Sequence, residues 1–391
     1  MTIEAFLYKA LKDQKVICNL CSHRCVIAAG HRGLCGVREN RSGVLHSLVF
    51  GKLIARHIDP IEKKPLYHFL PGTLSYSIAT VGCNFTCRFC QNADIAQMPS
   101  DHQGVIMGDA CTPEAVVAAA EKGGCRSIAY TYTEPTVFFE FAYETARLAR
   151  QRGIRNVFVT NGYMTAEALQ MIHPYLDAAN VDLKAFTPEY YKNLCGARLT
   201  PVKETLKRMK SMGIFVEVTT LIVPELNDDR RQLEKLATFL VDKLGPETPW
   251  HISRFHPTYK LTNHPPTPLK TLVKARDIGL KAGLRYVYTG NVPGQDSENT
   301  FCFSCGKRLI ARLGFQIQRY EIENGRCRYC DTELTVSACR TRITRFAYRF
   351  CRVAQDPVQK NEPNSYFNYK QLNGRRASHF LWFKILNFRI S

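Results

Sequence analysis

Three cysteines in one short segment form the strongest chemical signal in the sequence. Cys83, Cys87 and Cys90 follow a short apolar run that ends at Gly82, and they are spaced Cys-x3-Cys-x2-Cys. One tight loop can bring the three thiolates to a single point. Three thiolates are one fewer than a cubane iron–sulfur cluster usually takes, and one fewer than a closed structural zinc site. The spacing therefore predicts a metal centre with one open position that another molecule can fill.

Two further cysteine sets flank this segment. The N-terminal set lies within 18 residues and comprises Cys18, Cys21, Cys25 and Cys35. Glycines between these cysteines permit tight turns, so the set suits one metal site, and both zinc and an auxiliary iron–sulfur cluster fit it. The C-terminal set comprises Cys302, Cys305, Cys327 and Cys330. Two Cys-x2-Cys pairs at this spacing are typical of a zinc ribbon, with an iron–sulfur cluster as the alternative.

Composition indicates a soluble protein of a reducing compartment. The chain has 391 residues and 16 cysteines, and no basic, apolar leader begins it. Cysteine-rich chains without such a leader carry metal or redox chemistry more often than disulfides, so we expect a cytoplasmic protein. No apolar run approaches the roughly 20 residues of a membrane span. About half of the net charge of +19 falls in residues 335–391, which hold eleven Lys/Arg and two Asp/Glu.

The elements that position the cysteines alternate between strands and helices. Apolar and β-branched runs predict strands at 77–82, 126–132, 155–160, 179–184, 214–223 and 250–255, with a weaker seventh at 285–289. Helices are predicted at 112–122, 136–152, 165–176, 188–194, 200–212, 228–244 and 268–282. Such alternation indicates parallel β-α units, so we predict an α/β fold with a partial (β/α)6 barrel. Active sites of such barrels lie at the carboxyl ends of the strands.

The remaining residues divide into smaller modules. Residues 1–45 are predicted to form the N-terminal metal-binding module, with a short helix at 5–13, and 44–56 to form strands. The barrel should occupy 46–295, and a zinc-ribbon-like module 296–334. The basic, aromatic tail at 335–391 does not continue the pattern, and we expect it to be disordered or aberrant.

Polar residues follow several of the predicted strands. Glu134, Asn161 and His256 each come just after a strand, and Asp182 and Lys184 end another. For any one such residue a satisfied surface group is the more common outcome. Asp182 is the exception, because an unpaired buried carboxylate is costly, so it requires Lys184, a cation or a ligand.

These motifs together resemble the radical S-adenosylmethionine (SAM) superfamily. The resemblance rests on Gly82–Asn92, with its aromatic Phe89 before the third cysteine, and on Tyr130–Thr136, Val181-Asp-Leu-Lys and Arg254-Phe-His-Pro. The chain is similar to the pyruvate formate-lyase activating enzyme-like branch, and within it to the radical SAM member of the AmmeMemoRadiSam system. The similarity extends from Cys18 to about Leu334 and includes both outer cysteine sets.

The resemblance implies a cofactor and a reaction. Cys83, Cys87 and Cys90 would bind a [4Fe–4S] cluster, and SAM would occupy the fourth iron through its amino and carboxylate groups. One electron, from a donor such as ferredoxin or flavodoxin, would cleave SAM to methionine and a 5′-deoxyadenosyl radical that abstracts hydrogen from a substrate.

The same resemblance assigns cofactor-binding roles to single residues. Glu134 would lie near the SAM amino group, and Asp182 and Lys184 near its carboxylate. Phe89 would pack beside the adenine and the cluster. Asn161 and His256 complete the expected set around SAM.

Three readings of the function remain open. The first is a radical SAM enzyme that activates a protein partner by forming a glycyl radical. The second is a radical SAM enzyme that modifies a small molecule or RNA, which the basic surface and the ribbon allow. The third is a non-catalytic binding protein in which all three cysteine sets are structural. The polar residues at the strand ends and the absent fourth cysteine argue against the third.

Overall fold

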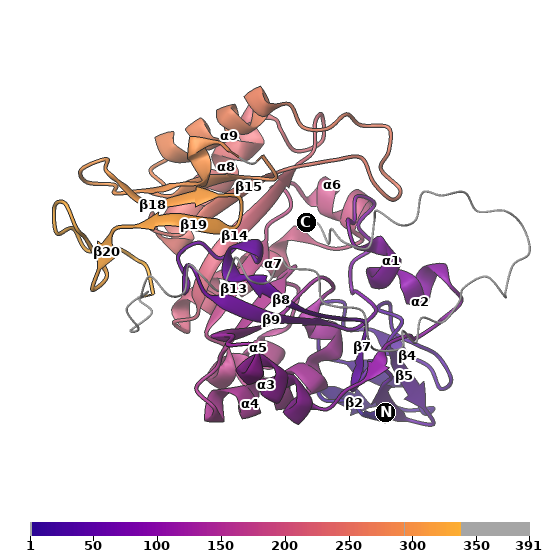
Figure 1. The fold of residues 1–391 in the computed structure, drawn as a ribbon. Coiled ribbons are helices and arrows are strands. Elements are labelled where there is room, and N and C mark those ends of the chain that lie inside the picture. The colour runs from indigo at the N-terminus through magenta and orange to yellow at the C-terminus, as the bar shows by residue number, and fades with distance from the viewer. Residues whose placement is uncertain (1, 293, 338–391) are drawn as a thin grey trace, which may run out of the picture. The chain divides into compact units, whose positions relative to one another are not determined.

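An eight-stranded β-sheet organises the part of the chain that the computed structural model describes, residues 2–292 and 294–337 (Figure 1). The strand order is β16-β15-β14-β13-β12-β11-β9-β8. Neighbouring strands from β9 to β16 are parallel, and β8 runs antiparallel to β9 at the edge. The strands are β8 (Ala55–Pro60), β9 (Leu74–Ala79), β11 (Ser127–Tyr130), β12 (Arg155–Thr160), β13 (Ala178–Asp182), β14 (Phe215–Ile222), β15 (Trp250–Arg254) and β16 (Val287–Gly290).

Helices connect the parallel strands. The main ones are α3 (Pro113–Lys122), α4 (Phe139–Gln151), α5 (Ala166–Ile172), α7 (Leu199–Ser211), α8 (Arg230–Leu244) and α9 (Leu269–Lys281). Hydroxyl or carboxylate side chains cap three of them: Thr112 accepts from Ala115 N and begins α3, and Thr165 and Asp229 cap α5 and α8 in the same way. In Figure 1, α3 and α4 lie at the end of the sheet near β9, and α8 and α9 at the end near β15.

This architecture confirms the predicted α/β fold. All seven predicted parallel strands are present, including the weaker seventh, and the strand order does not return to its start among the described residues, so the barrel is open. The strands β11 and β13 are buried along their whole length, as expected where helices cover a parallel sheet. The first strand ends at Ala79, three residues before Gly82.

The N-terminal module consists of short antiparallel strands. One sheet contains β1 (Ile3–Glu4), β6 (Val44–Ser47) and β5 (Arg38–Arg41), and another β2 (Tyr8–Ala10), β3 (Val16–Cys18) and β4 (Val26–Ile27). Two residue pairs join β7 (Lys52–Leu53) to β10 (Asp109–Ala110). Between α1 (Ala93–Ala96) and α3 lies the short α2 (Met98–Asp101).

The predicted helix at 5–13 is wrong. Tyr8–Ala10 pairs as a strand with Val16–Cys18, and a turn joins them. Asp13 and Gln14 in that turn have φ values of 57° and 54°, a left-handed conformation that ends a helix. The weak amphipathic pattern is therefore overridden by pairing with a neighbouring strand.

The C-terminal module is a small antiparallel unit. It contains β17 (Thr300–Phe301), β18 (Arg308–Leu313), β19 (Gln316–Tyr320), β20 (Ile322–Glu323) and β21 (Arg326–Cys327). Arg312 Nη2 donates to the carbonyl of Tyr67 at 2.9 Å, and the Leu70 N–H donates to Ser337 Oγ at 2.9 Å. The module is thereby anchored to the loop that precedes β9.

The start of the predicted tail packs onto the C-terminal module. Residues 335–337 pack onto the module and onto the loop before β9, whereas the rest of the predicted tail, 338–391, lies outside the described residues. No helix among the described residues is long and apolar enough to cross a membrane.

Candidate active site

The three-cysteine loop follows β9 directly and is fixed by its backbone. The N–H groups of Thr86 and Arg88 donate to the carbonyls of Cys195 and Leu194 at 3.0 and 2.9 Å, which ties the loop to the segment after β13. At Gly82, φ is +99°, and a Cβ atom would lie 2.6 Å from Val37 Cγ1. Only glycine fits at this position, because the N-terminal module packs closely against the turn.

The separation of the three thiols suits a cluster better than a single ion. Tetrahedral zinc, with bonds of about 2.3 Å to sulfur, holds its ligand atoms about 3.8 Å apart. Among the described residues, the C-terminal cysteine set is the one group of three or more Cys, His, Asp or Glu whose ligand atoms all lie within 4.8 Å of one another. Cys83, Cys87 and Cys90 do not form such a group among the described residues, as expected when each thiolate binds a different iron of a cubane.

The end of β12 contributes Asn161 to the cysteine loop. The Asn161 side-chain amide lies 3.9 Å from Cys83 Sγ and donates to Asn84 Oδ1 at 2.7 Å. The Phe85 N–H also approaches Cys83 Sγ, at 3.4 Å. Burial raises the pKa of the Cys83 thiol. N–H groups form stronger hydrogen bonds with a negatively charged thiolate than with a neutral thiol. These two N–H groups therefore suit a Cys83 that binds a metal as a thiolate.

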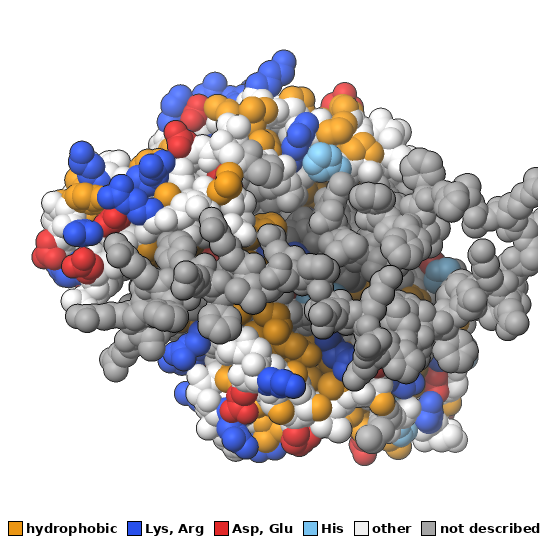
Figure 2. Space-filling view, in the orientation of Figure 1, with side chains coloured by type: hydrophobic (Ala, Val, Ile, Leu, Met, Phe, Trp, Pro, Cys, Tyr) orange, Lys and Arg blue, Asp and Glu red, His pale blue; other side chains and the backbone are white. Residues whose placement is uncertain are grey.

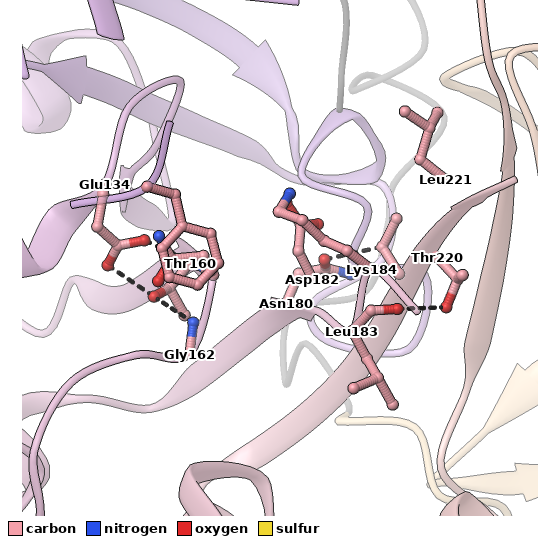
Figure 3. Close-up of polar contacts among 12 residues, drawn as sticks. Glu134, Thr160, Gly162, Asn180, Asp182, Leu183, Lys184, Thr220 and Leu221 are labelled. Carbon is pink, nitrogen blue, oxygen red and sulfur yellow. Dashed lines mark hydrogen bonds and ion pairs between the residues drawn. The ribbon is translucent and has the colours of Figure 1, made fainter. Parts of the chain in front are cut away.

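Glu134 joins the ends of β11 and β12. Its buried carboxylate accepts hydrogen bonds from Thr160 Oγ1 and the Asn161 N–H, both at 2.8 Å, and from Thr136 (Figure 3). Burial raises the pKa of Glu134, and the hydrogen bonds oppose that rise. The carboxylate therefore fixes the strand end that presents Asn161 to Cys83.

Asp182 and Lys184 form an ion pair at the end of β13. Lys184 Nζ lies 2.9 Å from Asp182 Oδ2, and both side chains are nearly buried (Figure 3). Burial disfavours the charged ammonium, but the Asp182 carboxylate and the Cys87 sulfur outweigh it and raise the pKa of Lys184. Lys184 Nζ also lies 5.7 Å from the centre of the buried Phe89 ring. Of the three partners that the sequence left open for Asp182, the structure shows Lys184.

Sequence reasoning missed Cys195. This buried cysteine ends the π-helical turn after α6 (Pro188–Tyr190). Its thiol interacts with the Cys87 thiol and lowers the pKa of Cys87. Nothing in the sequence spacing tied Cys195 to Cys87.

His256 lies on the same edge of the sheet, just after β15. It is half-buried, and four strands separate it from the cysteine loop in the strand order. The segment that follows it reaches the loop, because the Lys260 N–H donates to the carbonyl of Arg88 at 2.9 Å. The structure thus gathers Phe89, Asn161, Asp182 and Lys184 around the cysteines and places His256 farther along the same edge.

The two outer cysteine sets differ in geometry. In the C-terminal set, Cys302 Sγ and Cys330 Sγ are 3.7 Å apart, and Cys305 Sγ and Cys327 Sγ 3.8 Å apart. These separations match tetrahedral zinc. The four N-terminal cysteines instead line an enclosed cavity together with Asn84 and Thr136.

Comparisons with known proteins agree with this geometry. The model of the radical SAM superfamily matches residues 77–240, which include the cysteine loop and strands β11 to β14. An uncharacterized protein of Methanocaldococcus jannaschii, MJ0808, is 48% identical over 335 residues, which cover 85% of this chain and 99% of that relative.

The chain also has more distant similarity to proteins named as activating enzymes. The pyruvate formate-lyase-activating enzyme of Clostridium pasteurianum is 23% identical over 167 residues, covering 41% of this chain and 66% of that enzyme. A solved domain of a pyruvate-formate lyase-activating enzyme from Bacteroides vulgatus aligns with 42% of this chain and 99% of its own, at 16% identity and a TM-score of 0.38.

Proposed function

Because the chain belongs to the radical SAM superfamily, we propose that it cleaves SAM reductively at a [4Fe–4S] cluster held by Cys83, Cys87 and Cys90. When bound together, the cluster and SAM supply a 5′-deoxyadenosyl radical, with methionine as the other product of a one-electron cleavage. The observation that carries this proposal is the Cys-x3-Cys-x2-Cys loop after the first parallel strand, where the Asn161 amide lies 3.9 Å from Cys83 Sγ.

The residues around the loop are suited to bind and orient SAM. Lys184 presents a cation for the carboxylate of the methionine part, and Asp182 keeps that cation charged in a buried setting. Phe89 offers an apolar ring face beside the loop for the adenine. Asn161 directs its amide to Cys83, and Glu134 holds the backbone of Asn161 in place.

We propose a partner protein as the substrate, activated by formation of a glycyl radical. The similarity to the Clostridium enzyme named for activating pyruvate formate-lyase supports this choice. An RNA substrate is less favoured, because on the face in Figure 2 acidic side chains interrupt the Lys and Arg side chains, whereas nucleic-acid surfaces concentrate positive charge. A reduced ferredoxin- or flavodoxin-type protein is the proposed electron donor.

An anaerobic assay tests the reaction. The full chain is reconstituted with iron and sulfide, and reduced with dithionite in the presence of SAM. We expect equal amounts of 5′-deoxyadenosine and methionine. Cys87→Ala should abolish both products, and Cys125→Ala, which removes a buried cysteine outside the three sets, should leave them unchanged. Absence of 5′-deoxyadenosine while the cluster is intact would contradict the proposal.

Isotope transfer tests the substrate class. Cells grown on [2-²H₂]glycine supply separate protein, RNA and small-molecule fractions, and each fraction is incubated with the reduced enzyme and SAM. We expect 5′-deoxyadenosine to gain one mass unit only with the protein fraction. Deuterium transfer from the RNA or small-molecule fraction alone would replace the proposed substrate class with the other one.

A further inference from the structure

We propose that Cys18, Cys21, Cys25 and Cys35 hold a second [4Fe–4S] cluster rather than a zinc ion. The four cysteines surround a cavity between the hairpin of β3 and β4 and the loop after β9. His23, Arg38 and Asn84 line the same cavity.

The C-terminal set serves as an internal standard for zinc. Its sulfurs have closed to 3.7 and 3.8 Å, the separation that one tetrahedral ion imposes. The N-terminal sulfurs and His23 form no comparably close group of ligand atoms among the described residues. The same chain therefore contains one contracted and one expanded set of four cysteines, and the expanded set fits four irons at the corners of a cubane.

Two buried donors independently indicate what fills the cavity. Arg38 Nε and Asn84 Nδ2 both border it, and within the described residues neither has a hydrogen-bond partner. The two side chains are only 2% and 3% exposed. A buried N–H group without an acceptor is costly, and zinc offers no acceptor. The sulfides and thiolates of a cluster accept N–H hydrogen bonds, so a cluster satisfies both groups.

The surrounding contacts hold Arg38 against the cavity. Arg38 Nη1 lies 2.8 Å from Glu140 Oε1, and Nη2 donates to the carbonyl of Phe6 at 2.6 Å. With both terminal nitrogens engaged, the Nε–H is left on the cavity side. Apolar side chains, including the buried Ile27 and Val137, line other parts of the wall.

The second cluster would differ from the first in its ligation and would lie beside it. Four cysteines occupy all four irons, so the second cluster has no open position for SAM. Asn84 borders the cavity and directly follows Cys83, and its carbonyl is 2.7 Å from His23 Nε2. The N-terminal module thus places a closed cluster next to the loop that carries the open one.

Metal and sulfide analysis of a Cys83→Ala/Cys87→Ala/Cys90→Ala triple variant tests this inference independently of SAM cleavage. After anaerobic reconstitution of the full chain, we expect about four iron and four acid-labile sulfide per chain, together with about one zinc. The electron paramagnetic resonance signal of the reduced variant should not change when SAM is added. About two zinc and no sulfide would overturn the inference.

The unaltered protein supplies a measurement that does not depend on how a variant folds. We expect about eight iron, eight sulfide and one zinc per chain, whereas about four iron and two zinc would contradict the second cluster. Cys21→Ala/Cys25→Ala should halve the sulfide content, and Cys111→Ala/Cys125→Ala, a matched loss of two cysteines outside the sets, should leave it unchanged. Full sulfide retention in Cys21→Ala/Cys25→Ala would also exclude these ligands.

Discussion

Lys184 Nζ and Asp182 Oδ2 lie 2.9 Å apart at the carboxyl end of β13, with side chains only 9% and 11% exposed. Asp182 is the last residue of β13 and Lys184 lies two residues beyond it, in the segment that leaves the strand. Their pairing keeps a cation beside Phe89 and Cys87, where the proposed cofactor requires one.

Removal of Lys184 alone should lower the free energy of unfolding far more than replacement of both Asp182 and Lys184. Lys184→Met leaves the Asp182 carboxylate buried and unpaired by lysine, so we expect a loss of about 3–5 kcal/mol in the free energy of unfolding. Asp182→Asn combined with Lys184→Met should recover most of that loss, while neither variant binds SAM. Chemical denaturation and equilibrium dialysis measure the two effects.

An exposed ion pair provides the control for that cycle. Lys207 and Glu204 also form an ion pair, but their side chains are 40% and 47% exposed. Lys207→Met should change the free energy of unfolding by less than about 1 kcal/mol. Equal losses in the free energy of unfolding for Lys184→Met and Lys207→Met would show that the buried pair at β13 contributes no more to stability than an exposed pair.

Cys195 should tune the reduction potential of the cluster at Cys87. The interaction between its thiol and Cys87 favours negative charge on the Cys87 sulfur, and that charge grows when the cluster is reduced. Cys195→Ala should therefore lower the midpoint potential, by roughly 40 mV for an interaction of about 1 kcal/mol. A redox titration followed by electron paramagnetic resonance checks this, with Cys125→Ala as the control. An unchanged potential in Cys195→Ala would rule out the role.

Glu62 should make stability depend on pH. Burial raises its pKa to about 7, and its Oε1 accepts from the Gly72 N–H at 2.8 Å. The folded state thus retains a proton that the unfolded chain has released, so this contribution is full below about pH 4.5 and is lost as the pH rises through 7. At about 1.4 kcal/mol per pKa unit, the loss is about 3 kcal/mol.

Comparison with Glu62→Gln isolates that effect from other titrating groups. Glutamine keeps an oxygen for the Gly72 N–H but cannot release a proton. We expect the melting temperature of the original protein, relative to the variant, to fall between pH 5 and pH 8. A constant difference over this range would show that Glu62 does not titrate there.

Zinc should hold the C-terminal module against the loop before β9. Cys327→Ser should release the zinc and increase hydrogen exchange at residues 67–70, because Arg312 and Ser337 anchor that loop. Elemental analysis and hydrogen exchange measure the two effects. Retention of zinc, or unchanged exchange at that loop, would contradict the assignment.

Most of the barrel could be predicted because its strands are buried on both sides. Val157–Val159 is an apolar run, and the strand β13 is rich in Ala and Val, with helix caps and glycines nearby. The edge strand β8 was not foreseen, since Ala55–Pro60 contains Arg, His, Asp and Pro and depends on pairing with β9. The helix predicted at 5–13 failed for the same reason, because pairing between distant residues overrode a weak local signal.

The candidate site could be predicted only where the spacing of residues in the sequence indicates the chemistry. The three cysteine sets are local in sequence, so their members could be identified directly. The interaction between Cys195 and Cys87, and the orientation of Arg38 and Asn84 toward one cavity, arise from packing across long sequence separations. Distinguishing a zinc site from a cluster site likewise required the distances between sulfur atoms, which sequence spacing alone does not determine.

The central claim is that Cys83, Cys87 and Cys90 leave one iron open for SAM. Electron–nuclear double resonance on the reduced protein tests it with SAM labelled by ¹⁵N in the amino group or ¹⁷O in the carboxylate. We predict hyperfine coupling from both labels, and its loss in the Cys83→Ala/Cys87→Ala/Cys90→Ala variant. Bound SAM without coupling from either label, in a protein whose cluster is intact, would contradict the account.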